Sequence, residues 1–184
     1  MFEGSTRVPS FWQWKGVFEA GRDISKLTAH FDFFPTFMEL AGIEPVASTP
    51  KHEGRSLLPL FSDPQHKWAD RYLYFNTGKW DPEDDVRDYK FKSAAIRNAK
   101  YRLIWSRDEE ILLNLENDRA NLENVAKNHP EIVQAMKAEY EKWWERVYPH
   151  AIKTLPPVVE QEWAKTFSQL RKPEVAPTYE VPAL

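Results

Sequence analysis

Residues 92–117 read KSAAIRNAKYRLIWSRDEEILLNLEN, and this stretch decides the fold. It holds three short apolar segments of strand type, at 92–98, 101–106 and 110–117, with polar turns between them. A fourth segment, RYLYFN at 71–76, precedes them. Parallel strands need a crossover of roughly a dozen residues or more, so this close spacing favours antiparallel pairing. The sequence therefore predicts a four-stranded antiparallel sheet.

A long amphipathic helix is expected directly after these strands, from Pro130 to about Tyr148. Proline is tolerated in the first turn of a helix because its missing N–H has no partner there anyway. Apolar side chains recur every three or four residues along one face: Ile132, Val133, Met136, Tyr140, Trp143, Trp144 and Val147. Trp143 and Trp144 could form a sugar-stacking platform, but their helical spacing favours the core. A sheet with one helix across it is an α+β unit.

The N-terminal third of the sequence has a different pattern, with one expected strand, one expected helix and a long connection. Residues 5–14 read as a strand, and LTAHFDFFPTFMELAGI at 27–43 reads as a helix capped by Asp32 and ended by Gly42. The apolar residues of this segment recur at the spacing of a helix: Phe34, Phe37, Met38 and Ala41. Residues 44–64, rich in Pro, Ser and Gly, read as a connection across a surface.

Composition excludes several classes of protein. The chain has 184 residues, 42% of them apolar, which is enough to build a packed core. A net charge of −3 gives no broad attraction to nucleic acids or anionic membranes. No apolar run approaches the roughly 18 residues of a membrane span, and charges within the first twenty residues do not fit a signal peptide, which leaves the compartment open. The absence of cysteine excludes disulfides and thiolate sites.

Catalytic constellations are weak. The glycines are too scattered for a phosphate-binding loop, and no serine lies in a nucleophile elbow. The acidic stretch WDPEDDVRD at 80–88 has the oxygen ligands that calcium prefers, but it lacks the spacing of a calcium loop and reads as a solvated turn. His30 and Asp32 could form a catalytic pair, although a capping role for Asp32 is favoured. The sequence predicts no catalytic residue and no metal ligand.

The stretch NTGKW at 76–80 is the best candidate for ligand binding. It follows an expected strand and places the cation of Lys79 next to the indole of Trp80 at a glycine turn. A cation beside an aromatic ring suits an anionic ligand that contains a ring. A plain hairpin turn is the alternative.

Several segments, in order, resemble the type I sulfatases of the alkaline-phosphatase-like superfamily. FEGSTRVPSFWQWKGVFEAG at 2–21 is similar to that family's Y-E-G-G-x-R-V-P … W-P-G … G segment. LTAHFDFFPTFMELAGI resembles its D-x-x-P-T-x-x-x-L-A-G helix, and HEGRSLLPLF at 52–61 its D-G-x-S-L-x-P-L-L segment. The stretch from AIRNAKYRLIW to NHPEIV resembles its R-x-x-x-y-K-L … D-P-x-E-x-x-N-L-A-x-x-x-P ending, with Asp118–Arg119 in place of Asp-Pro. The resemblance covers about residues 2–148.

This resemblance implies a fold and an organisation. Residues 1–60 would be the end of the large α/β domain, and residues 65–150 the C-terminal α+β subdomain with its four-stranded sheet and packed helix. Residues 151–184 lie beyond the resemblance, and their prolines predict an extended tail with a short helix near 158–170. The formylglycine nucleophile and the calcium ligands of the family precede the first matched segment. The chain is therefore expected to be the C-terminal portion of a sulfatase, without cofactor of its own and inactive alone.

The resemblance also implies ligands and partners. The parent enzyme would hydrolyse sulfate esters of glycans or aryl sulfates. Some members carry Gly-Arg-Trp where this chain has Gly78, Lys79 and Trp80, which gives the last two a substrate-contact role. A related phosphonate or phosphodiester hydrolase, a non-catalytic glycan-binding module and association with a full-length relative are the alternatives. In a fragment, the apolar faces of four N-terminal aromatic residues would be exposed: Phe11, Trp12, Phe34 and Phe37.

Overall fold

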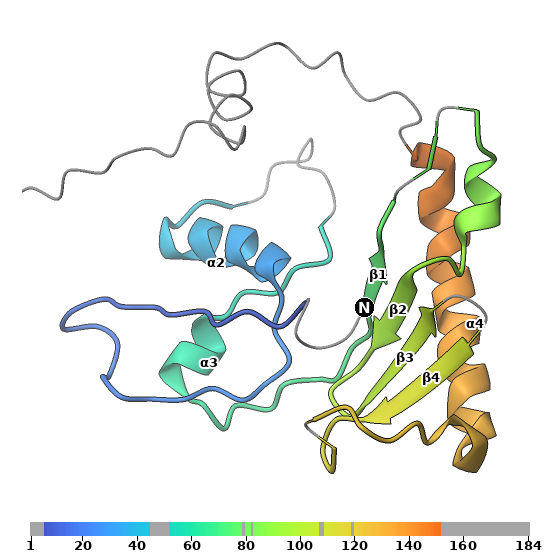
Figure 1. The fold of residues 1–184 in the computed structure, drawn as a ribbon. Coiled ribbons are helices and arrows are strands. Elements are labelled where there is room, and N and C mark those ends of the chain that lie inside the picture. The colour runs from blue at the N-terminus through green and yellow to red at the C-terminus, as the bar shows by residue number, and fades with distance from the viewer. Residues whose placement is uncertain are drawn as a thin grey trace, which may run out of the picture.

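The computed structural model describes residues 6–44, 52–78, 80–81, 83–106, 109–118 and 120–151. Figure 1 shows two units side by side: helices α2 and α3 with their loops, and a sheet crossed by helix α4. We call residues 6–44 and 52–72 the N-terminal unit, and the described residues from 73 to 151 the sheet subdomain. The expected boundaries at 60 and 65 stay a prediction, and residues 152–184, where an extended tail with a short helix is expected, lie outside the described residues.

The sheet has four strands in the order β1-β2-β3-β4, and each pairs with the next in antiparallel fashion. The strands are β1 (Leu73–Asn76), β2 (Ala94–Arg97), β3 (Tyr101–Ser106) and β4 (Glu109–Asn114). Each lies within, or one residue beyond, the apolar segment that predicted it. The α+β architecture and the antiparallel pairing expected from the sequence are therefore confirmed.

Strand β3 is one of the two inner strands of the sheet. Its Ile104 stands opposite Ala95 of β2 and Ile111 of β4. Asn98 sets the turn that precedes it, because its Oδ1 accepts hydrogen bonds from the backbone N–H groups of Lys100 (3.0 Å) and Tyr101 (2.7 Å). A side chain that closes a turn in this way fixes the register of the two strands it joins.

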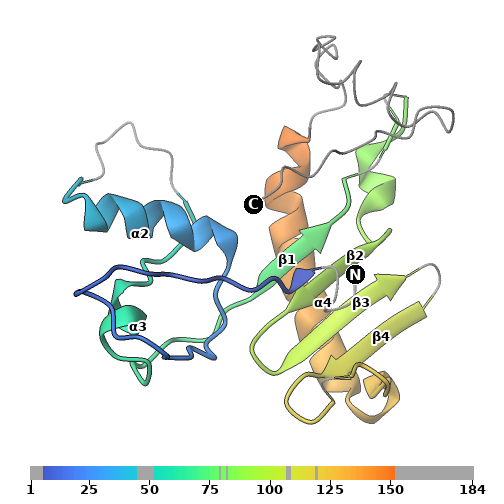
Figure 2. The same cartoon turned by 60° about the vertical axis from the view of Figure 1, so that its left-hand side comes forward.

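Helix α4 (Pro130–Val147) covers one face of the sheet, as the views in Figures 1 and 2 both show. Four side chains at spacings of three and four residues are buried beneath it: Val133, Met136, Tyr140 and Trp144. Trp144 is only 2% exposed, and Trp143 stacks on Tyr74 with ring centroids 5.0 Å apart. The tryptophan pair is therefore core, and the sugar-platform alternative is wrong.

Both faces of β3 are buried. Leu103 and Trp105 join the cluster under α4, whereas Ile104 packs with Ala95 and Leu113 on the opposite face. A strand buried on both faces reads as a near-continuous apolar run, which is what residues 103–105 show.

Helix α2 (Phe33–Leu40) confirms the helix expected in 27–43, and it ends as that sequence predicts. Gly42 has a φ of +65°, a conformation that suits glycine. Its N–H donates to Glu39 O (3.1 Å), and the N–H of Ile43 donates to Met38 O (2.9 Å). These two bonds make up a Schellman motif, which satisfies carbonyl groups that the helix leaves without partners.

The fully buried residue of α2 is a polar one. Phe34 and Phe37 are more than half exposed, while Thr36 is fully buried. Nearly every side of this helix carries an apolar residue, so spacing alone could not choose among them. The choice is made by a polar contact, because the Thr36 hydroxyl accepts a hydrogen bond from the N–H of Leu57 (2.9 Å).

The strand predicted for residues 5–14 is wrong as far as the structure describes them, from residue 6 on. Its backbone pairs with no strand of the described chain. Instead the carbonyl of Trp14 accepts from the N–H groups of Val17 (3.0 Å) and Phe18 (2.9 Å), which closes a turn. The indole of Trp12 lies about 5 Å from the rings of three phenylalanines: Phe33, Phe37 and Phe61.

The connection expected over 44–64 contains a short helix in its described part, α3 (Leu58–Ser62). Leu60 within this helix and Leu57 just before it are buried. Four 3₁₀ turns complete the described elements: His30–Asp32, Val86–Tyr89, Ala126–Asn128 and Tyr148–His150. Among the described helices, none combines the length and the apolar character needed to cross a membrane.

Candidate functional site

The turn at 76–80 begins at the end of β1 and is anchored in the core by Asn76. The Nδ2 of Asn76 donates to Tyr140 Oη and to Tyr89 O, both at 3.1 Å. Its Oδ1 accepts from the N–H of Gly78 (2.8 Å), whose φ is +60°. Burial raises the pKa of Tyr140 to about 12, against the smaller opposing effect of the Asn76 hydrogen bond. The hairpin alternative is wrong, because β2 does not begin until Ala94.

Trp80 lies at the edge of the core that this turn rests on. Its ring is half-buried against the cluster beneath α4 and meets the ring of Tyr89 edge-on, with centroids 6.2 Å apart. A side chain on Gly78 would begin only 3.5 Å from the indole. Lys79, the other predicted contact residue, lies outside the described residues. Trp80 is thus fixed on one side and partly open on the other.

The acidic stretch after Trp80 is organised by internal hydrogen bonds. The carboxylate of Asp84 accepts from the hydroxyl of Tyr89, and this bond is the main reason that the pKa of Tyr89 is raised. Asp85 precedes the 3₁₀ turn at Val86–Tyr89 and accepts from the N–H of Arg87 (2.9 Å). This confirms the interpretation of the stretch as an acidic turn at the surface.

A hollow of about 530 Å³ lies between this acidic turn and the C-terminal end of α4. The residues that line it are Glu83, Asp84, Asp85, Val86, Arg87, Tyr148, Pro149 and Ala151. Among them, three carboxylates stand against one guanidinium. A sulfate group would be repelled by this charge balance, so the hollow does not fit an anionic ligand. Among the described residues, no group of three or more His, Asp or Glu side chains is placed to hold a metal ion such as calcium.

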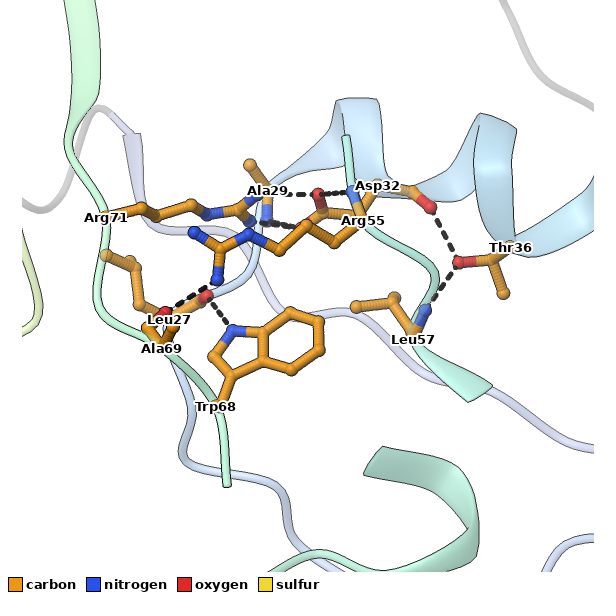
Figure 3. Close-up of polar contacts among 9 residues, drawn as sticks. All are labelled: Leu27, Ala29, Asp32, Thr36, Arg55, Leu57, Trp68, Ala69 and Arg71. Carbon is orange, nitrogen blue, oxygen red and sulfur yellow. Dashed lines mark hydrogen bonds and ion pairs between the residues drawn. The ribbon is translucent and has the colours of Figure 1, made fainter. Parts of the chain in front are cut away.

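A buried carboxylate, Asp32, is the centre of a second polar constellation (Figure 3). Arg71 forms a bidentate ion pair with it, with Nη1 2.8 Å from Oδ1 and Nη2 on Oδ2. The N–H of Arg55 donates to Oδ1 (2.9 Å), and the N–H of Ala29 donates to Oδ2 (2.8 Å). A carboxylate has about four acceptor sites. All four are in use, so this group is not free to act as a general base.

The predicted pairing of His30 with Asp32 is thereby corrected. Asp32 occupies the N-cap position of α2 without a side-chain bond to that helix, but its carboxylate does have a capping role one turn earlier, where it accepts from the N–H of Ala29, the N-cap residue of the 3₁₀ turn His30–Asp32. His30 is exposed while Asp32 is fully buried, so the two do not form a catalytic pair. The carboxylate is drawn away from the helix because an arginine offers two charge-assisted hydrogen bonds, which are stronger than one bond to a helix N–H.

Arg55 and Trp68 extend this constellation. Arg55 Nη1 donates to Ala69 O (2.6 Å), and its guanidinium lies 5.4 Å from the centre of the Trp68 ring. Trp68 Nε1 donates to Leu27 O (2.9 Å). Burial is the main cause that lowers the pKa of Arg55. The constellation therefore joins the start of α2 to the segment that leads into β1.

Sequence reasoning did not find Thr36, Arg55 or Arg71. One signal was available for Thr36, which follows Asp32 by four residues and so lies on the same side of the helix. Its hydroxyl donates to Asp32 O (2.6 Å). Nothing in the local sequence linked Arg71 to a carboxylate 39 residues earlier.

Comparison with known proteins identifies the family. Residues 1–146 match the family described as N-sulphoglucosamine sulphohydrolase, C-terminal. Human arylsulfatase D is 37% identical over 78 residues, which cover 42% of this chain and 13% of that protein. Arylsulfatase K of Danio rerio is 30% identical over 146 residues, which cover 73% of this chain and 25% of that protein. The chain thus spans a quarter or less of the length of these two relatives.

The fold has a counterpart among solved structures. The crystal structure of Ps i-CgsB superposes with a TM-score of 0.58 at 22% identity, over 85% of this chain and 32% of that one. A likeness at this identity concerns the fold of the backbone alone. The family match over residues 1–146 gives the assignment: the chain belongs to the family of N-sulphoglucosamine sulphohydrolase C-terminal regions, which are sulfatase C-terminal regions.

Proposed function

We propose that this chain supplies the C-terminal, substrate-side part of a sulfatase and does not cleave sulfate esters by itself. In this proposal the formylglycine nucleophile and the calcium ligands belong to the α/β region that precedes the matched segment in the family. The chain contributes a folded subdomain and one wall of the substrate site. Catalysis of this kind needs a nucleophile and concentrated positive charge together.

The observation that carries the proposal is the distribution of exposed apolar side chains. Seven of the eight large hydrophobic residues that are exposed lie in the described N-terminal unit: Val8, Phe11, Trp14, Val17, Phe34, Phe37 and Ile43. The expected exposure is confirmed for Phe11, Phe34 and Phe37, whereas Trp12 is half-buried among phenylalanine rings. A surface of this kind fits a protein partner better than water. We infer that the α/β region of a sulfatase covers it.

The substrate contact is proposed at the turn 76–80. Trp80 offers a partly open indole whose position the turn fixes, and an indole face suits the apolar face of a sugar ring. Lys79 would attract the sulfate group. One further structure supports a sugar over a simple aryl sulfate: Ps i-CgsB was crystallised with k-i-k-neocarrahexaose, and that structure superposes with a TM-score of 0.56 at 23% identity, over 85% of this chain and 32% of that one.

Activity assays test the first part. The full chain, with calcium present, should release no 4-nitrocatechol from its sulfate ester above the buffer rate. A chimera in which this chain replaces the matched C-terminal part of arylsulfatase K should cleave that ester, and should not cleave bis-4-nitrophenyl phosphate in its place. Turnover by the chain alone would contradict the proposal, and preference for the phosphodiester would favour the related hydrolases.

Binding assays test the second part. Calorimetry of the full chain with a sulfated oligosaccharide and with its desulfated form should show a preference for the sulfated one. Trp80→Ala should weaken binding about tenfold, equal to about 1.4 kcal/mol. Trp14→Ala is the matched control, since Trp14 is a half-exposed indole on the N-terminal unit. Equal losses for the two variants would contradict a contact at Trp80.

A further inference from the structure

The segment 52–57 is the part of the N-terminal unit that reaches toward the end of α4 in the sheet subdomain, and its backbone is tied to the start of α2. The N–H of Arg55 donates to Asp32 Oδ1, and the N–H of Leu57 donates to Thr36 Oγ1, both at 2.9 Å. Figure 3 shows these two bonds reaching the helix from the same strip of chain. Two backbone donors held by two buried side chains fix the path of the segment along the helix.

Gly54 brings this segment into direct contact with the turn that precedes α2. A Cβ placed on Gly54 would lie 2.2 Å from the carbonyl oxygen of Phe31 and 3.1 Å from Cγ of Pro35. The first distance is far inside van der Waals contact, and the atom it meets belongs to the backbone. Only a residue without a side chain fits there.

The side chains of the same segment reach the other unit and the chain that leads into it. Glu53 forms an ion pair with Arg146 near the end of α4. Arg55 donates to Ala69 O, in the run that continues into β1. Residues 52–57 therefore contact α2 through their backbone, the run that leads into β1 through Arg55, and the sheet subdomain through the Glu53–Arg146 pair.

The joint is polar, because the apolar cores do not cross it. Among the described residues, both hydrophobic clusters draw their members from the sheet subdomain, apart from Tyr72, the last residue of the N-terminal unit. Leu57 and Leu60, which are buried in the N-terminal unit, belong to neither cluster. Units that share no apolar core can separate at a lower free energy than global unfolding requires.

We infer that residues 52–57 act as a latch: they hold α2 and the rest of the N-terminal unit in a fixed relation to the sheet subdomain, and opening the latch frees α2 while the subdomain stays folded. The inference does not rest on the proposed function. It concerns the conformation of the chain. It predicts that one methyl group at position 54 speeds hydrogen exchange of the backbone amides in α2 without speeding that of the amides in the sheet subdomain.

Hydrogen exchange on the full chain, read by mass spectrometry, tests this. Gly54→Ala should speed exchange in peptides covering residues 29–44 at least tenfold and leave those of β3 and α4 unchanged. Gly16→Ala is the control, because a methyl group there meets nothing within 4 Å; despite its φ of +80°, it should change the 29–44 peptides less than threefold. Equal acceleration in α2, β3 and α4, or none in α2, would overturn the latch.

A second variant, Arg55→Leu, tests the latch independently in case Gly54→Ala does not fold. Arg55→Leu keeps the backbone N–H that binds Asp32 but removes the guanidinium from Ala69 O and Trp68. It should speed exchange of residues 29–44 about fivefold, again without effect on β3 and α4. If α2 exchange is unchanged in this variant, the segment is a passive connection.

Discussion

The sheet subdomain and the N-terminal unit are built on opposite principles. The subdomain buries ten side chains in one apolar cluster under α4 and exposes one large hydrophobic residue, Leu122. The described N-terminal unit buries a carboxylate and a hydroxyl, Asp32 and Thr36, and leaves seven large apolar side chains outside. A self-sufficient fold is recognised by where its apolar surface goes.

The difference teaches that the two units depend on different neighbours. Apolar burial at roughly 25 cal/mol per Å² is enough to hold a sheet against a helix. A hydrogen-bonded ion pair orders the groups around it, but it contributes little net stability once the desolvation of both charges is counted. The N-terminal unit is therefore shaped by its polar contacts and stabilised by whatever covers its aromatic surface.

The largest loss in the free energy of unfolding is expected from Trp144→Ala, which removes a side chain from the apolar cluster under α4. Trp144 is 2% exposed and packs its ring on Tyr140 and Tyr148. Replacing a buried tryptophan with alanine costs about 3–5 kcal/mol, because apolar contacts are lost and a cavity remains. Urea unfolding followed by circular dichroism measures it.

The control for that variant is Leu122→Ala in the same subdomain. Leu122 is 86% exposed, so its truncation should change the free energy of unfolding by less than about 0.5 kcal/mol. Similar costs for Trp144→Ala and Leu122→Ala would mean that the cluster under α4 does not stabilise the subdomain.

The second-largest loss of stability is expected from Arg71→Met, which removes the ion pair buried in the N-terminal unit. It leaves the fully buried Asp32 carboxylate without its counter-ion, a change that costs about 3 kcal/mol. The cost should appear as faster exchange of the Leu57 amide, which the neighbouring Thr36 hydroxyl protects. Amides of β3 should keep their protection.

The matched control is Arg22→Met, which removes an arginine from a solvent-exposed partner. Glu19 is 75% exposed and 3.5 Å from Arg22, so this pair is worth at most about 1 kcal/mol. If both variants speed exchange of the Leu57 amide equally, the buried pair is no more important to the unit than a surface pair.

The same contrast explains how much of the fold could be predicted from sequence. The sheet and α4 were predictable because each side chain's neighbours are set by local period: Val133, Met136, Tyr140 and Trp144 fall on one face whatever lies opposite. The N-terminal unit was not. The backbone of residues 6–14 has no neighbouring strand among the described residues, and a strand pattern becomes a strand only where another pairs with it.

The site residues divide in the same way. Trp80 could be nominated from its place beside a glycine turn, because such turns are written in the local sequence. The ion pair between Asp32 and Arg71 could not, because the two residues are 39 positions apart and meet only once α2 and the approach to β1 lie side by side. Local capping chemistry predicted a role for Asp32, which its bond from the Ala29 N–H bears out at the 3₁₀ turn before α2, but it could not predict the stronger, distant partner Arg71.

The third prediction concerns pH and one buried phenol. Burial raises the pKa of Tyr140 to about 12. The folded chain therefore holds the phenol proton of Tyr140 more tightly than the unfolded chain, in which tyrosines titrate at about pH 10. The stabilisation is complete below about pH 10 and is lost as the pH rises from about 10 to about 12. Urea unfolding at pH 9 and pH 11.5 measures this loss.

Tyr140→Phe isolates the contribution of this group. At neutral pH the variant should cost about 1 kcal/mol, because the Nδ2 of Asn76 loses one of its acceptors. Its further loss between pH 9 and pH 11.5 should be smaller than that of the unaltered chain. Tyr72, Tyr74 and Tyr89, whose pKa values are also raised, remain in both proteins and cancel in the difference. Parallel pH curves would show that Tyr140 does not titrate in this range.

The smallest effect on stability is expected from Phe11→Ser, and it gives the sharpest view of the aromatic surface. Phe11 is 92% exposed, so removing its ring should change the free energy of unfolding by less than about 0.5 kcal/mol. Its effect should appear in self-association instead, because water-exposed aromatic rings that need a covering partner bind each other when none is present. Sedimentation velocity across a concentration series should show fewer oligomers for Phe11→Ser than for the unaltered chain, and Leu122→Ala, on the self-sufficient subdomain, should leave the distribution unchanged. Equal oligomer content in all three proteins would mean that the exposed aromatic surface is tolerated in water as it stands, and that the N-terminal unit needs no partner to cover it.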